Sequence, residues 1–352
     1  MRSMLFVPGD RPERFEKAAA SGADAVILDL EDAVAAAQRP RARQAIADHL
    51  AQAPRPVPLW VRINPVDTTD ALQDLAAVVP ACPDGLVLPK ARNGADVVRL
   101  DHWLEALEAM HAIVPGAIRV IPMITETAQA MLSLATFAPS PARVMAMTWG
   151  AEDLATELGA ASNRDAAGEY ETPYRLASAG CLYTAAAAGV AAIDTVDTEI
   201  KDIAAIERRA RASRRAGYTA KLAIHPAQIA ALHAAFTPSA DEVAHAEAVL
   251  AAFSKSPGAG ALRVDGKLVD RPHVLQAERV LARPDMTPER FAALLARQTP
   301  DAEKRRRADF VIDSSLGIEA ARAAVADILA TVTHPGWISR HRGIPGPTEA
   351  GH

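Results

Sequence analysis

The chain has 352 residues, half of them hydrophobic, and a mean hydropathy of +0.03. It is long enough for a closed α/β barrel with additional elements or for two ordinary domains. A formal net charge of −5 and a pI of about 6.1 provide no basic field that would favour nucleic acid or an anionic membrane. Cys82 and Cys181 lie far apart without metal-type spacing, which suits a reducing compartment. Because no apolar run suits a signal peptide or a membrane span, we expect a cytoplasmic protein.

One pattern recurs between residues 3 and 226: a short apolar run, a charged turn and an Ala-rich amphipathic stretch. Continuous rather than alternating apolar character indicates parallel strands that are covered on both faces. Eight such runs predict a closed (β/α)₈ TIM barrel. A doubly wound open sheet is the alternative, but no glycine-rich fingerprint follows the first run. The runs are Met4–Pro8, Ala25–Leu30, Leu59–Asn64, Gly85–Pro89, Arg119–Ile124, Val144–Trp149, Ala191–Thr195 and Lys221–His225.

Helical patterns follow the apolar runs, including those over Pro12–Ser21, Ala71–Val79, Ala95–Ile113 and Ile200–Ala216. After residue 238 the pattern changes, so we expect the barrel to occupy residues 1–238 and a lid-like appendage to occupy residues 239–283. A helical extension over 284–332 and a flexible tail over 333–352 are expected to follow. Within the appendage, the sequence predicts a capping box at Ser239–Glu242, a strand and turn over Leu262–Val269 and a helix over Pro272–Ala282.

Polar residues stand at the ends of the predicted strands, and in such barrels these ends meet at one mouth. Acidic residues from four strand ends would repel one another unless a cation lay between them. Carboxylates without a His/Cys cluster favour Mg²⁺. We interpret Glu126 and Asp153 as its two direct ligands and Glu152 as the weaker candidate. For any one of these acids alone, a helix cap is the simpler interpretation.

Basic and amide side chains also occur at these strand ends. Arg62 and Asn64 are expected to point the same way along one strand, and a buried Arg requires an anionic partner. We interpret Arg62 as a clamp for a substrate carboxylate or a developing enolate oxygen, with an ion pair to Glu31 as the structural alternative. Lys90 is a candidate for binding substrate, or for an internal ion pair.

These patterns resemble the HpcH/HpaI aldolase/citrate lyase family, in particular its citrate lyase β-subunit-like CoA-ester lyases. The resemblance covers about residues 2–283. It implies Mg²⁺-dependent cleavage of malyl-CoA, citramalyl-CoA or citryl-CoA to acetyl-CoA and a 2-oxo acid. Thioester hydrolysis at the same site and a non-catalytic CoA-binding subunit are the alternatives. The matching motifs are RSMLFVPGDRPERFEKA, AVILDLEDAV, VRINP, GLVLPKA, ITETAQA, WGAEDLATELG, KLAIHPAQI and DGKLVDRPHVLQA.

The resemblance also assigns roles to individual residues and implies a homo-oligomer, a trimer or hexamer. Its metal ligands match Glu126 and Asp153, its substrate arginine matches Arg62, and an active-site acid matches Glu31. Asp270 matches an acid that is delivered into a neighbouring subunit's site, although a helix N-cap is the structural alternative. The candidates for contacting CoA are Phe6, Arg11 and Arg14, while Asn64 and Lys90 are candidates for the substrate.

The segment Met286–Val332 departs from this family and resembles the C-terminal helices of dephospho-CoA kinases. The phosphate-binding loop of those kinases is absent from the sequence, so we expect no kinase activity. The sequence does not identify the acyl group of the substrate.

Overall fold

The computed structural model describes residues 1–256, 258–282, 310 and 318–332, which divide into two compact units. The first unit is Met1–His245, and the second begins at Ala246. Every helix in the described ranges is too short or too polar to cross a membrane. The predicted tail lies outside the described residues, and of the predicted extension mainly one helix, α14 (Ile318–Val332), lies within them.

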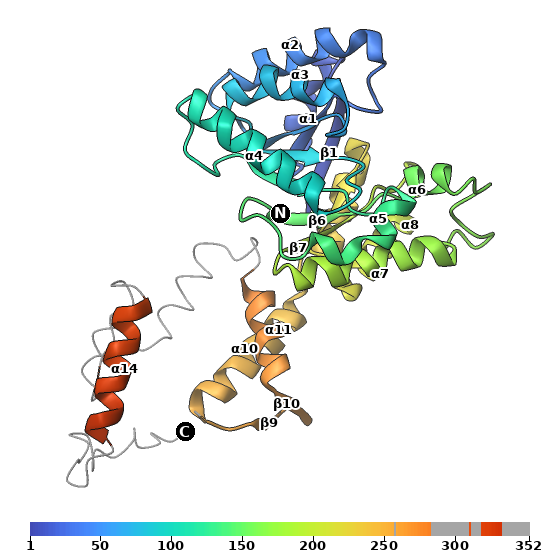
Figure 1. Ribbon diagram of the computed structural model, residues 1–352. Helices are drawn as coiled ribbons and strands as arrows, with labels where there is room; N and C mark the ends of the chain where they lie inside the picture. Colours follow the sequence, from blue (N-terminus) through green and yellow to red (C-terminus); the bar gives the residue numbers. More distant parts are fainter. Residues whose placement is uncertain (257, 283–309, 311–317, 333–352) are drawn as a thin grey trace. The chain divides into compact units, whose positions relative to one another are not determined.

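The first unit is built on eight parallel strands (Figure 1). Their hydrogen-bonded order, β5-β4-β3-β2-β1-β8-β7-β6, leaves β5 and β6 at the two ends, and two isolated parallel bridges join these ends. The predicted (β/α)₈ barrel is therefore confirmed. The strands are β1 (Ser3–Pro8), β2 (Ala25–Asp29), β3 (Leu59–Arg62), β4 (Gly85–Leu88), β5 (Arg119–Pro122), β6 (Ala146–Thr148), β7 (Ala191–Asp194) and β8 (Ala220–Ala223).

Four helices of the first unit, α3, α4, α5 and α8, begin at a residue whose side chain caps them. The Thr68 side chain accepts a hydrogen bond from the Ala71 N–H at the start of α3, and Asp202 caps α8 in the same manner. Gly217, with a φ of +123°, follows the last residue of α8. The helices are α1 (Phe15–Ala19), α2 (Arg39–Leu50), α3 (Thr69–Val78), α4 (Gly94–Met110), α5 (Ala128–Leu132), α6 (Ala151–Glu157), α7 (Thr172–Ala187), α8 (Ile203–Ala216) and α9 (Ile229–Phe236).

Alternate residues of each strand point into the barrel, and apolar side chains fill its interior. Trp60 is the largest of them, and a Cβ atom on Gly85 would lie 2.2 Å from its ring, so only glycine fits at that position. The same alternation continues toward the carboxyl ends of the strands. Ile27 on β2 is followed by Asp29 two residues later, and Trp60 on β3 is followed by Arg62. The inward positions thus change from apolar to charged at the barrel mouth.

The second unit has a small core of its own. The strands β9 (Ala261–Val264) and β10 (Lys267–Asp270) form an antiparallel hairpin that precedes α11 (Arg271–Leu281). The helix α10 (Ala240–Lys255) crosses the boundary between the two units. The predicted strand and turn over Leu262–Val269 correspond to this hairpin, whereas the domain boundaries at residues 238 and 283 stay predictions.

Candidate active site

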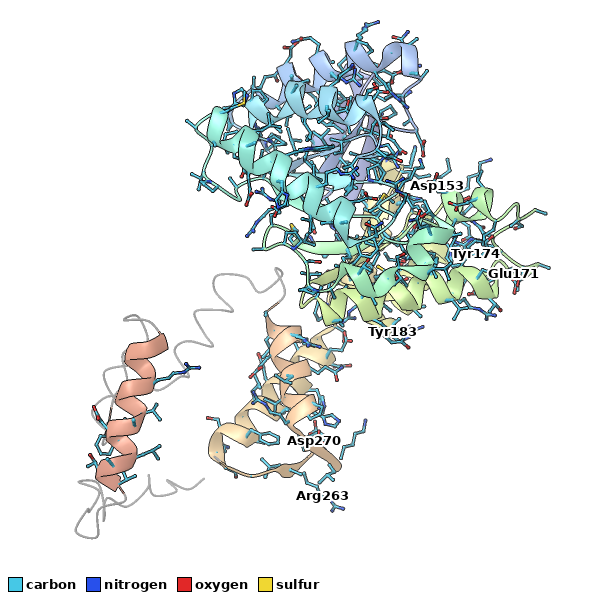
Figure 2. All side chains as sticks on the ribbon, viewed as in Figure 1. Asp153, Glu171, Tyr174, Tyr183, Arg263 and Asp270 are labelled. Carbon is cyan, nitrogen blue, oxygen red and sulfur yellow. The ribbon has the colours of Figure 1, made fainter. Side chains whose placement is uncertain are left out.

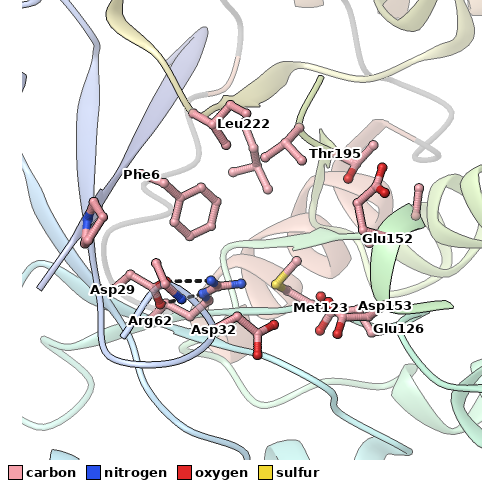
Figure 3. A pocket seen from close by; sticks show the side chains of 16 residues that line it. Phe6, Asp29, Asp32, Arg62, Met123, Glu126, Glu152, Asp153, Thr195 and Leu222 are labelled. Atoms are coloured by element: carbon pink, nitrogen blue, oxygen red, sulfur yellow. Dashed lines mark hydrogen bonds and ion pairs between the residues drawn. The ribbon is translucent and has the colours of Figure 1, made fainter. Parts of the chain in front are cut away.

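A cavity of about 300 Å³ opens at the carboxyl ends of the barrel strands (Figure 3). Most of its lining residues come from the ends of the barrel strands or from the loops that follow them. Its location is the one at which (β/α)₈ barrels carry their working residues. The lining includes Phe6, Pro8, Asp29, Asp32, Arg62, Met123, Glu126, Gly150, Glu152, Asp153, Thr195, Val196, Leu222 and Ile224.

Arg62 is held by two carboxylates at the inner side of this cavity. Its Nε and Nη2 atoms donate to the two oxygens of Asp29 at 2.7 and 2.6 Å. Its Nη1 atom lies 3.1 Å from Oε2 of Glu31. Burial lowers the pKa of Arg62, but the negative charges of Asp29 and Glu31 outweigh burial and raise that pKa above its ordinary value. The guanidinium is therefore a fixed positive charge in the cavity wall.

Glu126 follows β5 and is buried, with 2% of its surface exposed. Its Oε2 atom accepts the backbone N–H of Lys90 at 2.6 Å. A Cβ atom on Gly150 would lie 2.6 Å from its Oε1 atom, so the glycine at that position lets the carboxyl group approach the turn before α6. Burial raises the pKa of Glu126 well above its usual range, and the charges of Asp153 and Glu31 raise that pKa further.

The carboxyl groups of Glu126 and Asp153 come together at this cavity, the second from the first turn of α6 (Figure 3). Within the described parts of the chain, no group of three or more His, Cys, Asp or Glu side chains is arranged to hold a metal ion. Two carboxylates that retain room for water and substrate nevertheless suit Mg²⁺, which takes few protein ligands. A divalent cation would also relieve the repulsion that raises the pKa of Glu126.

Lys90 links the acidic residues at the mouth. Its φ of +49° is in the left-handed region, and this backbone presents its N–H to Glu126. Its ammonium group lies 2.8 Å from Asp32 and 3.1 Å from Asp153, and it also pairs with Glu31. These contacts form the internal ion pair that is one of the two interpretations of Lys90 from the sequence. A direct contact between Lys90 and the substrate stays a prediction.

The side chain of Asn64 does not line the cavity as that of Arg62 does. The strand β3 ends at Arg62, so its alternation of inward and outward side chains does not extend to Asn64. Its side-chain amide donates to the Leu30 carbonyl at 3.0 Å and to Asp74 at 2.8 Å. Its backbone N–H also donates to Asp74, at 2.7 Å. These buried contacts fix the loop after β3. The predicted role of Asn64 in binding substrate is supported by none of them and stays a prediction.

The residues expected to contact CoA or to donate a proton lie in different parts of the structure. Phe6 lines the cavity, with the centre of its ring 4.8 Å from Cζ of Arg62. Arg11 and Arg14 are exposed in the turn after β1. Asp270 belongs to the second unit, where its Oδ1 atom lies 2.6 Å from Nδ1 of His273 at the start of α11 (Figure 2 labels Asp270). The helix-cap alternative for Asp270 is therefore present, and its catalytic role stays a prediction.

Asp29 is the closest partner of Arg62, and the two are paired in register on β2 and β3, but no sequence pattern indicated this contact. The apolar residues Val196, Leu222 and Ile224 also line the cavity without having been predicted to do so. Counting inward positions along each strand would have found Asp29 and Leu222, because both lie an even number of residues from an inward apolar side chain.

Carboxylates and a clamped arginine thus gather around one cavity at the mouth of a (β/α)₈ barrel. The chain belongs to the HpcH/HpaI aldolase/citrate lyase family, whose model matches residues 2–226. A (3S)-malyl-CoA thioesterase of Cereibacter sphaeroides is 36% identical over 291 residues, covering 80% of this chain and 94% of the relative.

Two solved structures from Mycobacterium tuberculosis are similar to this chain. The protein CitE in complex with magnesium, acetoacetate and coenzyme A is 38% identical, with a TM-score of 0.67, and the match covers 80% of this chain and 96% of CitE. A citrate lyase beta subunit complexed with oxaloacetate and magnesium is also 38% identical, with a TM-score of 0.58, and the match covers 67% of this chain and 96% of that subunit.

Proposed function

We propose that the protein is a Mg²⁺-dependent lyase that cleaves a 3-hydroxyacyl-CoA to acetyl-CoA and a 2-oxo acid. Malyl-CoA, citramalyl-CoA and citryl-CoA are the candidate substrates. The observation that carries the proposal is the convergence of Glu126, Asp153 and Arg62 on one cavity at the barrel mouth. The family and the complexes of CitE with magnesium and coenzyme A support it.

Glu126 and Asp153 are the residues that would hold the metal ion. When bound, Mg²⁺ supplies Lewis-acid polarisation of the reacting oxygen and neutralises negative charge that develops there. Glu126 is positioned for this task by the N–H of Lys90, and Asp153 by its place in the first turn of α6. Lys90 balances the remaining acidic charge through Glu31, Asp32 and Asp153.

In the proposed reaction the substrate hydroxyl gives its proton to a carboxylate of the cavity wall, and the adjacent carbon–carbon bond breaks as the hydroxyl oxygen becomes the carbonyl oxygen of the 2-oxo acid. The electron pair of that bond passes to the thioester fragment and forms an enolate. Arg62 offers a fixed positive charge to the enolate oxygen, and Asp29 and Glu31 keep its guanidinium in place. Because these partners remove any need for reorganisation, Arg62 acts as a preorganised electrostatic group.

A proton must then reach the enolate carbon to give acetyl-CoA. We assign this step to Asp270, supplied by a neighbouring subunit of a trimer or hexamer, with His273 as its hydrogen-bonding partner. Phe6, Arg11 and Arg14 are assigned to CoA, and the exposure of both arginines makes them accessible to its phosphates.

Thioester hydrolysis is a second candidate, because the thioesterase relative is 36% identical. Analysis of the products distinguishes the two reactions. Incubation of malyl-CoA and citramalyl-CoA with the enzyme and Mg²⁺ should release acetyl-CoA and glyoxylate or pyruvate. Release of free CoA and the intact hydroxy acid would instead assign the hydrolase. Glu126→Gln should abolish either reaction and serves as the control for contaminating enzymes.

A further inference from the structure

The turn that follows β2 carries the two acids that fix Arg62. Asp29 and Glu31 both contact its guanidinium, and Figure 3 shows the bonds from Asp29. The Asp29 carboxylate also accepts the backbone N–H groups of Glu31 and Ala33, at 3.0 and 3.1 Å. The direction of the guanidinium therefore depends on the backbone conformation of this turn.

One peptide group of the turn, which joins Leu30 to Glu31, is held at both of its polar atoms. Its N–H donates to Oδ1 of Asp29 at 3.0 Å, and the same oxygen accepts Nε of Arg62. Its carbonyl oxygen, which belongs to Leu30, accepts the side-chain amide of Asn64 at 3.0 Å. A continuous chain of hydrogen bonds thus runs from Asn64 through this peptide group and Asp29 to Arg62.

The side chain of Asn64 is itself oriented by Asp74 on α3. Oδ2 of Asp74 accepts the backbone N–H and the side-chain amide of Asn64, at 2.7 and 2.8 Å. Oδ1 of Asp74 accepts Nε of Arg43 on α2 at 2.6 Å. The two amide hydrogens of Asn64 are therefore both used, one by Asp74 and one by Leu30. Asp74 is 0% exposed and Asn64 1%, so bulk water does not compete for these bonds.

The side-chain bond of Asn64 adds a constraint that the neighbouring backbone bonds do not supply. The bond from the Asn64 backbone to Asp74 fixes the loop after β3, and the Leu30 N–H continues the strand pairing by donating to the Arg62 carbonyl at 2.9 Å. Only the bond from the Asn64 amide to the Leu30 carbonyl connects this loop to the peptide group beside Asp29. A displacement of about 1 Å in a reacting group lowers a rate about 100-fold, so such a constraint matters for the reaction.

Building on the proposed function, we propose that Asn64 is a positioning residue that holds the guanidinium of Arg62 in place for the enolate oxygen. Asp74 holds the Asn64 amide, and Arg43 holds Asp74. In this role Asn64 acts through the turn after β2 and touches no substrate, in contrast to the substrate contact expected from the sequence.

Steady-state kinetics of the full-length enzyme with Mg²⁺ test this role, on the CoA ester that the wild type cleaves fastest. We expect Asn64→Ala to lower kcat about tenfold and to change KM by less than about threefold, because Arg62 acts on the enolate. Asp74→Asn, which keeps the size of the side chain, should lower kcat by about threefold or more. If kcat stays within about twofold of the wild type in Asn64→Ala, or in Asp74→Asn should Asn64→Ala not fold, the inference is overturned.

A double variant separates the positioning of Arg62 from a general loss of structure. If Asn64 acts through the guanidinium, its effect disappears once the guanidinium is removed. Asn64→Ala should therefore lower the kcat of an Arg62→Lys enzyme by less than about threefold, compared with about tenfold in the wild-type background. A larger factor in the Arg62→Lys background would mean that Asn64 acts independently of Arg62 and would overturn the inference.

Glu108→Gln is the matched control for a loss of stability. Glu108 on α4 is also a buried carboxylate that accepts an arginine, Arg143, and two N–H groups, those of Gly116 and Ile118. Gly116 and Ile118 precede β5, so this cluster lies at the opposite end of the strands from the cavity. Its melting temperature should fall as that of Asp74→Asn does, while its kcat stays within about twofold of the wild type. A kcat that falls equally in both variants would assign the effect to stability and contradict the role of Asn64.

Crystal structures of the wild type and of Asn64→Ala, in one crystal form, give a readout that does not depend on turnover. We expect the peptide group between Leu30 and Glu31 to rotate, and at least one of the two bonds between Arg62 and Asp29 to lengthen beyond about 3.5 Å. Retention of both bonds would overturn the inference. If no CoA ester reacts with the wild type, the proposed function fails, and this comparison still decides whether Asn64 positions Arg62.

Discussion

Arg62 and Asp29 lie opposite each other on adjacent strands and share two parallel hydrogen bonds of 2.7 and 2.6 Å. This fork fixes the guanidinium plane, and a lysine ammonium at the same position would reproduce only its charge. We expect Arg62→Lys to lower kcat/KM for citramalyl-CoA by about 100-fold or more while the protein stays folded. Steady-state kinetics and circular dichroism measure the two effects.

Arg92→Lys is the matched control for this substitution. Arg92 also pairs with two carboxylates, Asp67 and Asp96, but its side chain is 34% exposed and lies outside the cavity lining. Its activity should stay within about twofold of the wild type, as expected for surface ion pairs. Near-normal turnover of Arg62→Lys would remove Arg62 from the mechanism.

Lys90 provides the positive charge for Glu31, Asp32 and Asp153. Removing this charge in Lys90→Met leaves three neighbouring acids to repel one another, so the melting temperature of the EDTA-treated protein should fall by about 2–5 °C. Adding Mg²⁺ should raise the melting temperature of the Lys90→Met variant by more than it raises that of the wild type, because the ion supplies the missing positive charge. Differential scanning calorimetry with and without Mg²⁺ checks this expectation.

Lys17→Met is the control for this substitution, because Lys17 is exposed on α1. It should leave the melting temperature unchanged both with EDTA and with Mg²⁺. If Mg²⁺ stabilises the Lys90→Met variant no more than the wild type, Lys90 does not share its carboxylates with the ion.

Glu108 on α4 is fully buried and is bonded by Arg143 and by the N–H groups of Gly116 and Ile118. Burial alone would raise the pKa of Glu108, but these bonds outweigh burial and hold that pKa below its usual value. A carboxyl with a lowered pKa stabilises the fold above its unfolded-state pKa and loses this effect as the pH falls through its folded-state pKa.

Glu108→Gln should therefore lower the free energy of unfolding by about 1–3 kcal/mol at pH 7, because it removes the buried charge that Arg143 faces on α4 and leaves Asp101 as the remaining acidic partner of Arg143. The difference from wild type should shrink as the pH is lowered below about 4. Urea unfolding at several pH values measures both effects. Glu105→Gln on the exposed side of the same helix is the control, and an equal loss in the two variants would contradict the account.

Asp270→Asn should abolish turnover if Asp270 donates the proton to the enolate carbon. In mixed oligomers with Arg62→Lys subunits, some sites combine an intact Arg62 with an intact Asp270 from a neighbouring subunit. Activity should then return to roughly a quarter of the wild-type value for randomly mixed subunits. Absence of any recovery, in samples shown to contain both subunits, would indicate that each site is built within one chain.

Much of the barrel and its mouth follows from the sequence, since continuous apolar runs specify buried parallel strands and charged residues stand at their ends. Glu126 and Asp153 both line the cavity at this mouth, while their role as metal ligands stays a prediction. Asn64 was expected beside Arg62, but the exact end of β3 decides its direction, and strand ends are poorly encoded in local sequence. The left-handed backbone of Lys90 depends on its contact with Glu126, a long-range interaction that no local pattern reveals.

We propose that Glu126 and Asp153 together bind one divalent ion. Titration of Mn²⁺ followed by electron paramagnetic resonance measures this binding directly, without reference to turnover. We predict one site per chain, lost in Glu126→Gln and in Asp153→Asn but retained in Glu152→Gln, whose side chain bonds Asn163 instead. Unchanged Mn²⁺ binding in the first two variants, or its loss in Glu152→Gln alone, would contradict the account.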